Sequence, residues 1–274
     1  MDARSKPTPQ PPTGEFDGNT ETPCRLGMKL NMTLERILSE RPDFHALETE
    51  IEHAFDPAES VLPRKEALRL SGSDLTCYGI GADVLRFVAS EVNAETRSLE
   101  TGAGCSTLVF AVQRARHTAI TPSLEEIRRI RDYATKNEIH LDSVTFVAEP
   151  SDQHLPRCST EGLDIVLLDG KHAFPWPILD WFFTAHRLKR GGLLLLDDVQ
   201  LRSVAVLAEF LSADPGWKRV RDFSGKTILF QKTRERVLDV AWHMQPWTTA
   251  ASRSRARRIL RAILGRLRNS FRGW

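Results

Sequence analysis

The chain has 274 residues, of which 41% are hydrophobic, so it is long enough to bury one sizeable core or two small ones. Its net charge of +2 conceals an asymmetry, because residues 251–274 carry eight arginines and no acid, which leaves 30 basic against 36 acidic residues elsewhere. This mildly acidic body argues against nucleic-acid binding, and no apolar run reaches the ~18 residues of a membrane span.

The cysteine pattern and the first residues indicate a cellular compartment. The four cysteines lie far apart and form no C-x-x-C pair, which fits neither a zinc site nor a disulfide framework. The first residues, MDARSKPTPQPP, lack the apolar segment of a secretory signal. We therefore expect reduced thiols and a cytoplasmic protein.

The first 95 residues divide into a proline-rich segment and a helical segment. Residues 1–27 contain few hydrophobic side chains and are predicted to be disordered. Residues 28–95 are predicted to form a helical cap that leads into the core, with Phe44, Leu47, Ile51 and Phe55 at helical spacing before Pro57. A second amphipathic helix is predicted over residues 82–92.

From residue 96 to 233 strands and helices alternate. This pattern predicts a doubly wound, mostly parallel, seven-stranded Rossmann-like α/β sheet. The last two strands, joined by a turn at Ser224-Gly225, read as a hairpin that adds an antiparallel strand at one edge. The predicted strands are RSLET, HTAIT, SVTFVAE, LDIVLLD, LLLLDD, WKRVRDF and KTILFQK.

Polar and glycine residues follow several of these strands, where ligands of open α/β sheets bind. In LETGAGCSTL, Gly102 and Gly104 permit a tight turn and a close approach to the backbone, and Ser106 is placed to cap the next helix. A dinucleotide fingerprint would need a third glycine at Thr107. This difference disfavours a dinucleotide oxidoreductase.

Five segments in order, LETGAGCSTL, HTAIT, VTFVAEPSDQHLP, LDIVLLDGKHAFP and GGLLLLDD, resemble a class I S-adenosylmethionine-dependent methyltransferase. More narrowly, they resemble the catechol-O-methyltransferase-like branch of small-molecule O-methyltransferases, over roughly residues 71–232. The resemblance implies methyl transfer from S-adenosylmethionine to a hydroxyl group of a small molecule.

The resemblance also implies the cofactor contacts. The turn around Gly102 would wrap the methionine part of the cofactor, and polar residues after the third strand would lie against the adenine. Thr121 stands where the family usually has an acid for the ribose, and it offers one hydrogen bond where a carboxylate offers two. Glu125 is an alternative ribose contact, although it also suits the start of a helix. The implied cofactor-binding residues are Glu100, Gly102, Gly104, Ser106, Thr107, Thr121, Ser151, Asp152 and Asp169.

In metal-dependent members of this branch, acids after the fourth and fifth strands hold one Mg²⁺. The matching residues are Asp169, Asp197 and Asp198, three oxygen donors of the kind that Mg²⁺ prefers. A lysine in the relatives removes the proton from the acceptor, and His172 stands at its position, next to Lys171. Histidine suits this role because it titrates near neutral pH.

Several alternatives stay open at this stage. One is a metal-independent methyltransferase in which His172 acts alone, and another is a cofactor-binding scaffold without turnover that associates with a membrane. Phe174, Trp176 and the flanking prolines are interpreted as a wall for the acceptor, and Tyr78 is a further candidate to line the site. The acceptor itself, whether a polyphenol, a sugar or a secondary metabolite, is not specified by these residues.

The last region, residues 234–274, is predicted to be a linker followed by a basic amphipathic helix. Hydrophobic residues from Ile259 to Phe271 fall on one helical face, and the arginines spread over the rest. Such a helix is typical of binding to an anionic membrane surface at the inner face of a membrane. Packing on the protein's own acidic surface, or on a second subunit of a homodimer, are the alternatives.

Overall fold

The computed structural model describes residues 23–44 and 79–235 of the chain. The predicted disordered N-terminus up to residue 22, most of the helix around Leu47–Pro57, Tyr78 and the basic tail lie outside these residues. Among the described helices, none is long and apolar enough to cross a membrane.

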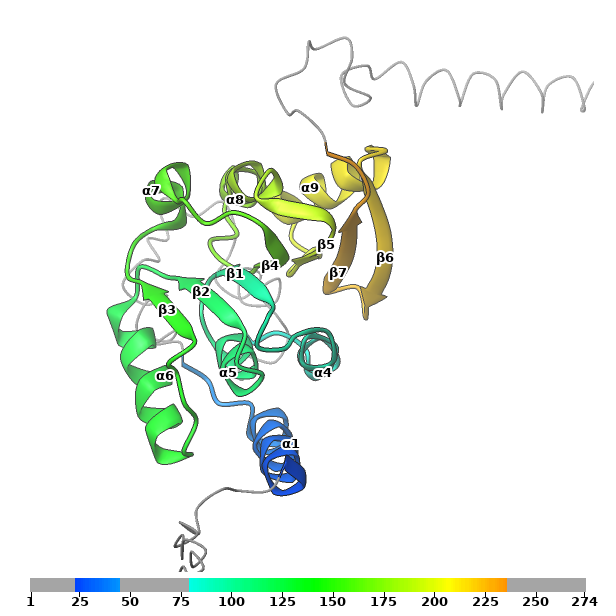
Figure 1. The fold of residues 1–274 in the computed structure, drawn as a ribbon. Helices are drawn as coiled ribbons and strands as arrows, with labels where there is room; N and C mark the ends of the chain where they lie inside the picture. Colours follow the sequence, from blue (N-terminus) through cyan, green and yellow to red (C-terminus); the bar gives the residue numbers. More distant parts are fainter. Residues whose placement is uncertain (1–22, 45–78, 236–274) are drawn as a thin grey trace, which may run out of the picture.

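A seven-stranded sheet organises the described residues (Figure 1). Its strand order is β3-β2-β1-β4-β5-β7-β6, in which the first five strands are parallel. The strands are β1 (Arg97–Thr101), β2 (Arg116–Ile120), β3 (Val144–Val147), β4 (Leu163–Leu168), β5 (Leu188–Leu196), β6 (Trp217–Phe223) and β7 (Thr227–Lys232). The predicted fold class is therefore confirmed.

The hairpin at one edge is the antiparallel part of the sheet. β7 pairs antiparallel with β5, and β6 pairs antiparallel with β7, so the reversed strand lies one place inside the edge. Ser224 and Gly225 have positive φ angles of 55° and 73°, as the two central residues of a type I′ turn require, and the Lys226 N–H closes this turn on the Phe223 carbonyl oxygen. This turn returns the chain to the end of β5.

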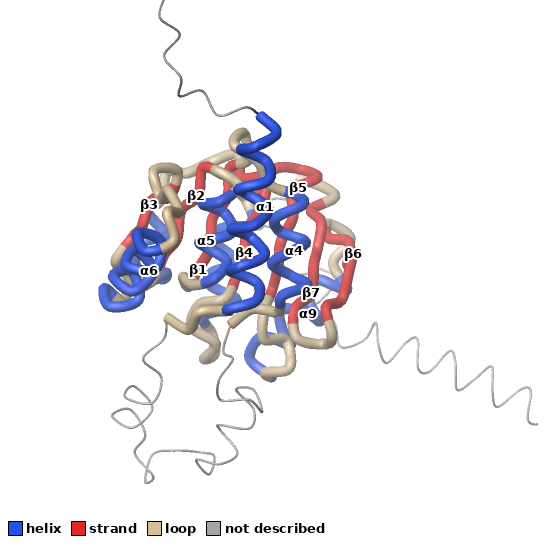
Figure 2. The backbone as a smooth tube through the Cα atoms, turned by 90° about the horizontal axis from the view of Figure 1, so that it is seen from below, coloured by secondary structure: helices blue, strands red, loops and turns tan. Residues whose placement is uncertain are grey.

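Helices cover both faces of the sheet and create two apolar layers. Figure 2 shows α1, α4 and α5 on one face, where they share a buried cluster with Ile165 and Leu167 of β4. The alternate residues Val166 and Leu168 point to the other face and pack with α8 and α9. The helices are α1 (Pro23–Glu40), α4 (Ala82–Glu91), α5 (Cys105–Val112), α6 (Leu124–Lys136), α7 (Ser151–His154), α8 (Trp176–Ala185) and α9 (Arg202–Ala213), with a 3-10 turn at Leu155–Arg157.

Two boundaries differ from the prediction. Helix α1 begins at Pro23 rather than near residue 28, and proline is compatible with the first helical position because its missing N–H has no helical partner there. Strand β5 begins at Leu188, five residues before the predicted strand LLLLDD, since Leu188 pairs with Leu163. An irregular register follows, in which Gly191 adopts a φ of +84° before regular pairing resumes at Leu193.

Candidate active site

A cavity of about 240 Å³ opens at the carboxyl ends of the parallel strands. It is bounded by the turn after β1, the loop after β4, the residue after β5 and the segment that follows α1. Its lining residues are Arg41, Pro42, Asp43, Phe44, Gly79, Ile80, Glu100, Gly102, Ala103, Gly104, Cys105, Ser106, Asp169, Gly170, His172 and Asp198. Seven of the predicted site residues are in this set.

The glycine turn after β1 is shaped for a close approach from inside the cavity. Gly102 has a φ of +88°, and a Cβ at this position would collide with the carbonyl oxygen of Asp169. At Gly104 a Cβ would meet no protein atom within 4 Å, because it would project into open space. The first glycine is therefore needed by the backbone, and the second leaves room for a ligand.

Thr107 supports this turn from behind rather than facing the cavity. It is fully buried, accepts a hydrogen bond of 2.9 Å from the Gly104 N–H and donates its own hydroxyl proton to Glu100. Its hydrogen bonds fix the turn to β1. The direct cofactor contact that the resemblance implies for Thr107 stays a prediction.

A buried histidine, absent from the residues predicted for the site, also supports Glu100. The Nε2 atom of His117 on β2 lies 3.0 Å from Glu100 Oε1, and its Nδ1 atom lies 2.9 Å from the Ser98 hydroxyl. The imidazole stacks on Phe110 with ring centroids 4.1 Å apart. Only the pairing of β1 with β2, which sets Ser98 beside His117, brings these groups together. In the sequence His117 reads as an ordinary strand residue.

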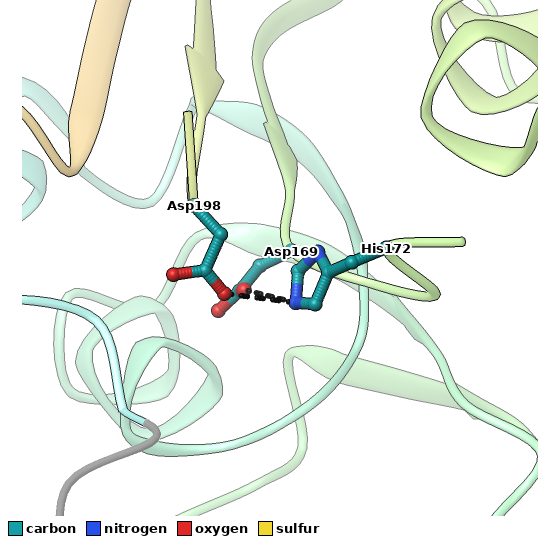
Figure 3. Close-up of side chains that lie close together, drawn as sticks. All are labelled: Asp169, His172 and Asp198. Carbon is teal, nitrogen blue, oxygen red and sulfur yellow. Dashed lines mark ion pairs between the residues drawn. The ribbon is translucent and has the colours of Figure 1, made fainter. Parts of the chain in front are cut away.

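At the ends of β4 and β5, three side chains converge (Figure 3). One ligand atom each from Asp169, His172 and Asp198 lies within 4.8 Å of the others. The His172 Nε2 atom is 2.9 Å from Asp198 Oδ2 and 3.8 Å from Asp169 Oδ1. The other oxygen of Asp198 accepts a hydrogen bond of 2.7 Å from the Gln200 amide.

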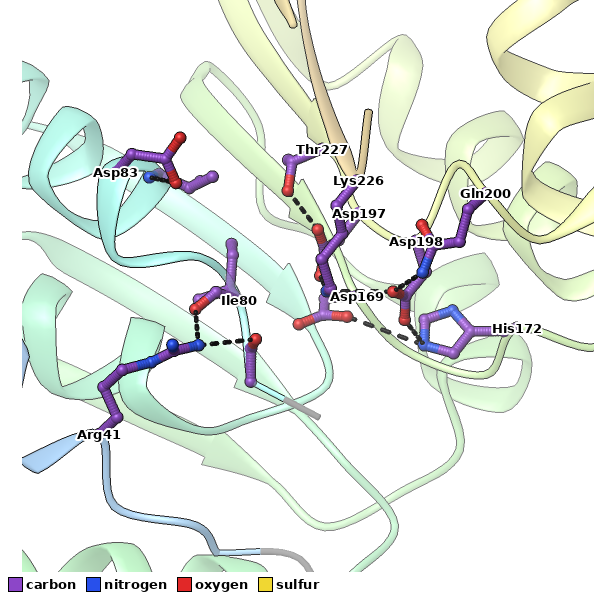
Figure 4. Close-up of polar contacts among 12 residues, drawn as sticks. Arg41, Ile80, Asp83, Asp169, His172, Asp197, Asp198, Gln200, Lys226 and Thr227 are labelled. Atoms are coloured by element: carbon purple, nitrogen blue, oxygen red, sulfur yellow. Dashed lines mark hydrogen bonds and ion pairs between the residues drawn. The ribbon is translucent and has the colours of Figure 1, made fainter. Parts of the chain in front are cut away.

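Asp197, the third predicted metal ligand, turns toward the β6–β7 hairpin instead (Figure 4). It is fully buried, and its two oxygens contact the Lys226 ammonium at 2.5 Å and the Thr227 hydroxyl. Lys226 also lies 3.0 Å from Asp198 Oδ1. The lysine thus links the two adjacent aspartates. No local pattern could have found it, because it lies 28 residues after Asp198 in the chain.

The charges of this cluster shift its ionisation. Burial and the nearby charge of Asp197 raise the pKa of Asp169 well above its usual value. Burial alone would also raise the pKa of Asp198, but the hydrogen bond from His172 and the charge of Lys226 lower it below its usual range. Burial likewise opposes the charge of Lys226, yet the carboxylates of Asp197, Asp169 and Asp198 raise the lysine pKa.

This donor set does not fit Mg²⁺. The four oxygens of Asp197 and Asp198 already have protein partners, and an ammonium group stands between the two carboxylates. The group that does converge includes an imidazole nitrogen, whereas Mg²⁺ demands oxygen ligands in near-octahedral geometry. The three predicted carboxylates therefore do not assemble around one common point.

The residues predicted to hold the ribose and adenine lie away from the cavity lining. Thr121 is buried and donates a hydrogen bond of 2.6 Å to Glu126, while accepting one from the Ser123 N–H. Glu125 pairs with Arg128 and Arg129 on the surface of α6, which lowers its pKa to about 2. Neither residue is among those that line the cavity, and the ribose contact stays a prediction.

Ser151 and Asp152, the predicted adenine contacts, begin α7 and are partly exposed. Behind them lies Asp180 of α8, which was not among the predicted site residues. Asp180 is 2% exposed, and burial raises its pKa to about 6 in spite of an opposing hydrogen bond from Ser151. A Cβ on Gly170 would lie 3.4 Å from Asp180, so this acid packs directly beneath the loop after β4.

The aromatic segment after His172 is divided between surface and core. The side chain of Phe174 is exposed, and the Lys171 ammonium lies 3.6 Å from the centroid of the Trp176 ring. This cation–π contact, rather than the cavity, holds Lys171. Trp181 is buried against Phe210 and Trp217, as expected for a residue inside a helix.

The chain was compared with known protein families and curated proteins. Residues 99–199, about a third of the chain, match the family model described as a methyltransferase domain. This segment runs from β1 to just beyond the end of β5 and includes every predicted site residue. A search of curated proteins gave no match.

Solved structures were compared as well. Cofactor-bound Rv0187 from MTB has 17% sequence identity and a TM-score of 0.49, and the alignment covers 70% of this chain and 98% of that one. An rRNA methylase from Streptococcus thermophilus has 14% identity and a TM-score of 0.43, with 56% and 96% covered. The O-methyltransferase TomG from Streptomyces achromogenes, in complex with SAM, has 15% identity and a TM-score of 0.47, with 68% and 96% covered.

Proposed function

We propose that the protein is an S-adenosylmethionine-dependent O-methyltransferase that acts on a small molecule, with His172 as the general base. The observation that carries this proposal is the 2.9 Å contact between His172 and Asp198 at the edge of a cavity whose other side is the glycine turn. The match of residues 99–199 to a methyltransferase domain supports it.

The cavity suits the shape of the proposed cofactor and presents polar groups to it. Gly104 leaves open the space that any side chain would fill, and Glu100 and Asp169 place carboxyl groups on the cavity wall. When bound, S-adenosylmethionine supplies an activated methyl group on a positively charged sulfur. The protein's own residues then have to orient the two reactants and exclude water, and such alignment is worth ~7–11 kcal/mol.

His172 and Asp198 are arranged as a base and its orienting carboxylate. With Nε2 directed at Asp198, the proton of the neutral imidazole is held on Nε2, and Nδ1 is left to accept the proton of the acceptor hydroxyl. Ser203 fixes the backbone of this loop by donating a hydrogen bond of 2.5 Å to the carbonyl oxygen of His172. The base is therefore held at both its ring and its backbone.

The surroundings of His172 favour an acceptor with an apolar ring. Phe174 is two-thirds exposed although it is a large apolar side chain, and it lies two residues beyond the proposed base. Ligand pockets are lined predominantly by hydrophobic and aromatic side chains, so an exposed ring close in the chain to the proposed base supports an acceptor with an apolar ring. An aromatic hydroxyl compound is accordingly the acceptor class that we propose.

A methyl-transfer assay tests the proposal. Wild-type protein would be incubated with radiolabelled S-adenosylmethionine and a panel of phenolic, sugar and aliphatic hydroxyl compounds. His172→Ala should lower kcat by ~10²–10⁴-fold while S-adenosylhomocysteine binding, measured by calorimetry, stays unchanged. His186→Ala, which removes an exposed histidine at the end of α8, is the matched control. Turnover that survives in His172→Ala would contradict the assignment of the base.

A further inference from the structure

We propose that Lys226 supplies the positive charge that a divalent cation would otherwise bring to the ends of β4 and β5. The methyl transfer proposed above would then proceed without a metal ion, and this inference rests on that proposed function.

The first observation is the position of the Lys226 ammonium. It lies 2.5 Å from Asp197 Oδ2 and 3.0 Å from Asp198 Oδ1, so one group compensates two adjacent carboxylates (Figure 4). A metal ion shared by these acids would have to displace the ammonium, since two cations cannot occupy the space between the same carboxylates without strong repulsion. The lysine therefore competes directly with a divalent cation.

The second observation is that the remaining donor atoms are already engaged. Asp197 Oδ1 accepts a hydrogen bond from the Thr227 hydroxyl, Asp198 Oδ1 also accepts one from Gln200, and Asp198 Oδ2 contacts His172. Each of these contacts would be lost if the oxygen turned to a metal. Because buried acids that lose their partners are costly, the existing arrangement resists such a change.

The third observation is that the backbone fixes the lysine at this place. The Lys226 carbonyl oxygen accepts a hydrogen bond of 2.9 Å from the N–H of Val199, two residues after Asp197. Its own N–H donates to Phe223 across the hairpin turn at 3.1 Å. The ammonium is consequently delivered by the β6–β7 hairpin and not by a free surface side chain, as its limited exposure of 28% also indicates.

In this arrangement, the positive charge and the orientation of the base come from different residues. Lys226 supplies the charge, and Asp198 orients His172. Lys226 holds Asp197 and one oxygen of Asp198, and the other oxygen of Asp198 remains directed at His172. Lys226 is thus a positioning residue that acts on His172 through Asp198. A metal at Asp198 would instead draw this carboxylate away from the imidazole.

Direct metal binding tests the inference independently of methyl transfer. Metal-free wild-type protein would be titrated with Mg²⁺ by calorimetry and with Mn²⁺ by electron paramagnetic resonance, and neither ion should bind stoichiometrically at millimolar concentration. Lys226→Met should create a site with Mn²⁺ affinity tighter by about 10–100-fold, the range over which groups around a metal change its affinity. The added substitution Asp197→Asn should remove that site.

Two control variants complete the experiment. Lys226→Arg keeps the positive charge and should bind no metal, and Lys218→Met removes an exposed charge from the neighbouring strand β6 and should behave as the wild type. One ion bound per wild-type chain, or a folded Lys226→Met variant that binds none, would overturn the inference. If Lys226→Met does not fold, the wild-type titrations decide alone. Failure of the proposed methyl transfer would appear separately, as the absence of turnover with unchanged metal results.

Discussion

The ends of β5 and β2 both present polar residues directly after a buried parallel strand, but the two regions use them differently. After β5, Asp198 divides its oxygens between Lys226, Gln200 and His172, and one contact faces the cavity. After β2, the hydroxyl of Thr121 is engaged by Glu126 and Ser123 at the start of α6. A polar residue at a strand end is therefore linked to the cavity when one of its partners lines the cavity, as His172 does for Asp198.

The largest effect is expected from a substitution that weakens the contact between Asp198 and His172. Asp198→Asn keeps the shape of the side chain but removes the charge that orients the imidazole, and it should lower kcat by ~10²–10⁴-fold. Gln200→Ala removes a contact on the other oxygen and should lower kcat far less. Steady-state kinetics measure kcat for both variants. An Asp198→Asn enzyme with full kcat would mean that the carboxylate does not assist the base.

Asp180, beneath the loop after β4, offers a test through pH. Its pKa is raised from 3.8 to about 6 in the folded protein, so its contribution to stability is full below pH 4 and is lost as the pH rises through about 6. The Asp180→Asn variant has no acid to ionise at this position, so it should not lose stability as the pH rises. Its free energy of unfolding at pH 7.5 should exceed that of the wild type by about 3 kcal/mol. Urea unfolding at pH 4 and pH 7.5 measures the effect. Parallel pH profiles for the two proteins would contradict it.

The glycine turn separates a backbone requirement from a ligand requirement. Gly104→Val places its side chain in open space, so the fold should be retained. Affinity for S-adenosylhomocysteine should fall by about 10–100-fold, because the valine side chain would crowd a ligand bound there. Gly102→Ala is the companion variant and should lower thermal stability, because its φ of +88° and the Asp169 carbonyl oxygen exclude a Cβ. Calorimetry and thermal unfolding compare the two. Unchanged affinity in Gly104→Val would place the cofactor elsewhere.

Thr121 should give the smallest change in binding. Thr121→Val removes hydrogen bonds to α6, and we expect a loss of about 1 kcal/mol in the free energy of unfolding. Affinity for S-adenosylhomocysteine should stay within about twofold of wild type, since Thr121 does not line the cavity. A large loss of affinity without a change in stability would show that the end of β2 contacts the cofactor after all.

The order of strands and helices, and the grouping of residues at the strand ends, could be predicted from the sequence alone. Within β4, residues 165–168 are buried on both faces of a parallel sheet, and this requirement is visible as a continuous run of hydrophobic residues. Glycine at positions 102 and 104 and acids at 169 and 198 lie at or just after the ends of predicted strands. Because parallel strands bring their carboxyl ends to one edge, strand prediction is enough to group these residues.

Which polar atoms have partners depends on the tertiary structure. His117 reaches Glu100 only through the pairing of β1 and β2, and Lys226 reaches Asp197 only because an antiparallel hairpin returns the chain to the end of β5. Such contacts join residues that are distant in the sequence and carry no periodic signal. Hydrogen bonds and ion pairs form only between atoms within a few ångströms of each other, and strand pairing, unlike local sequence patterns, sets those distances.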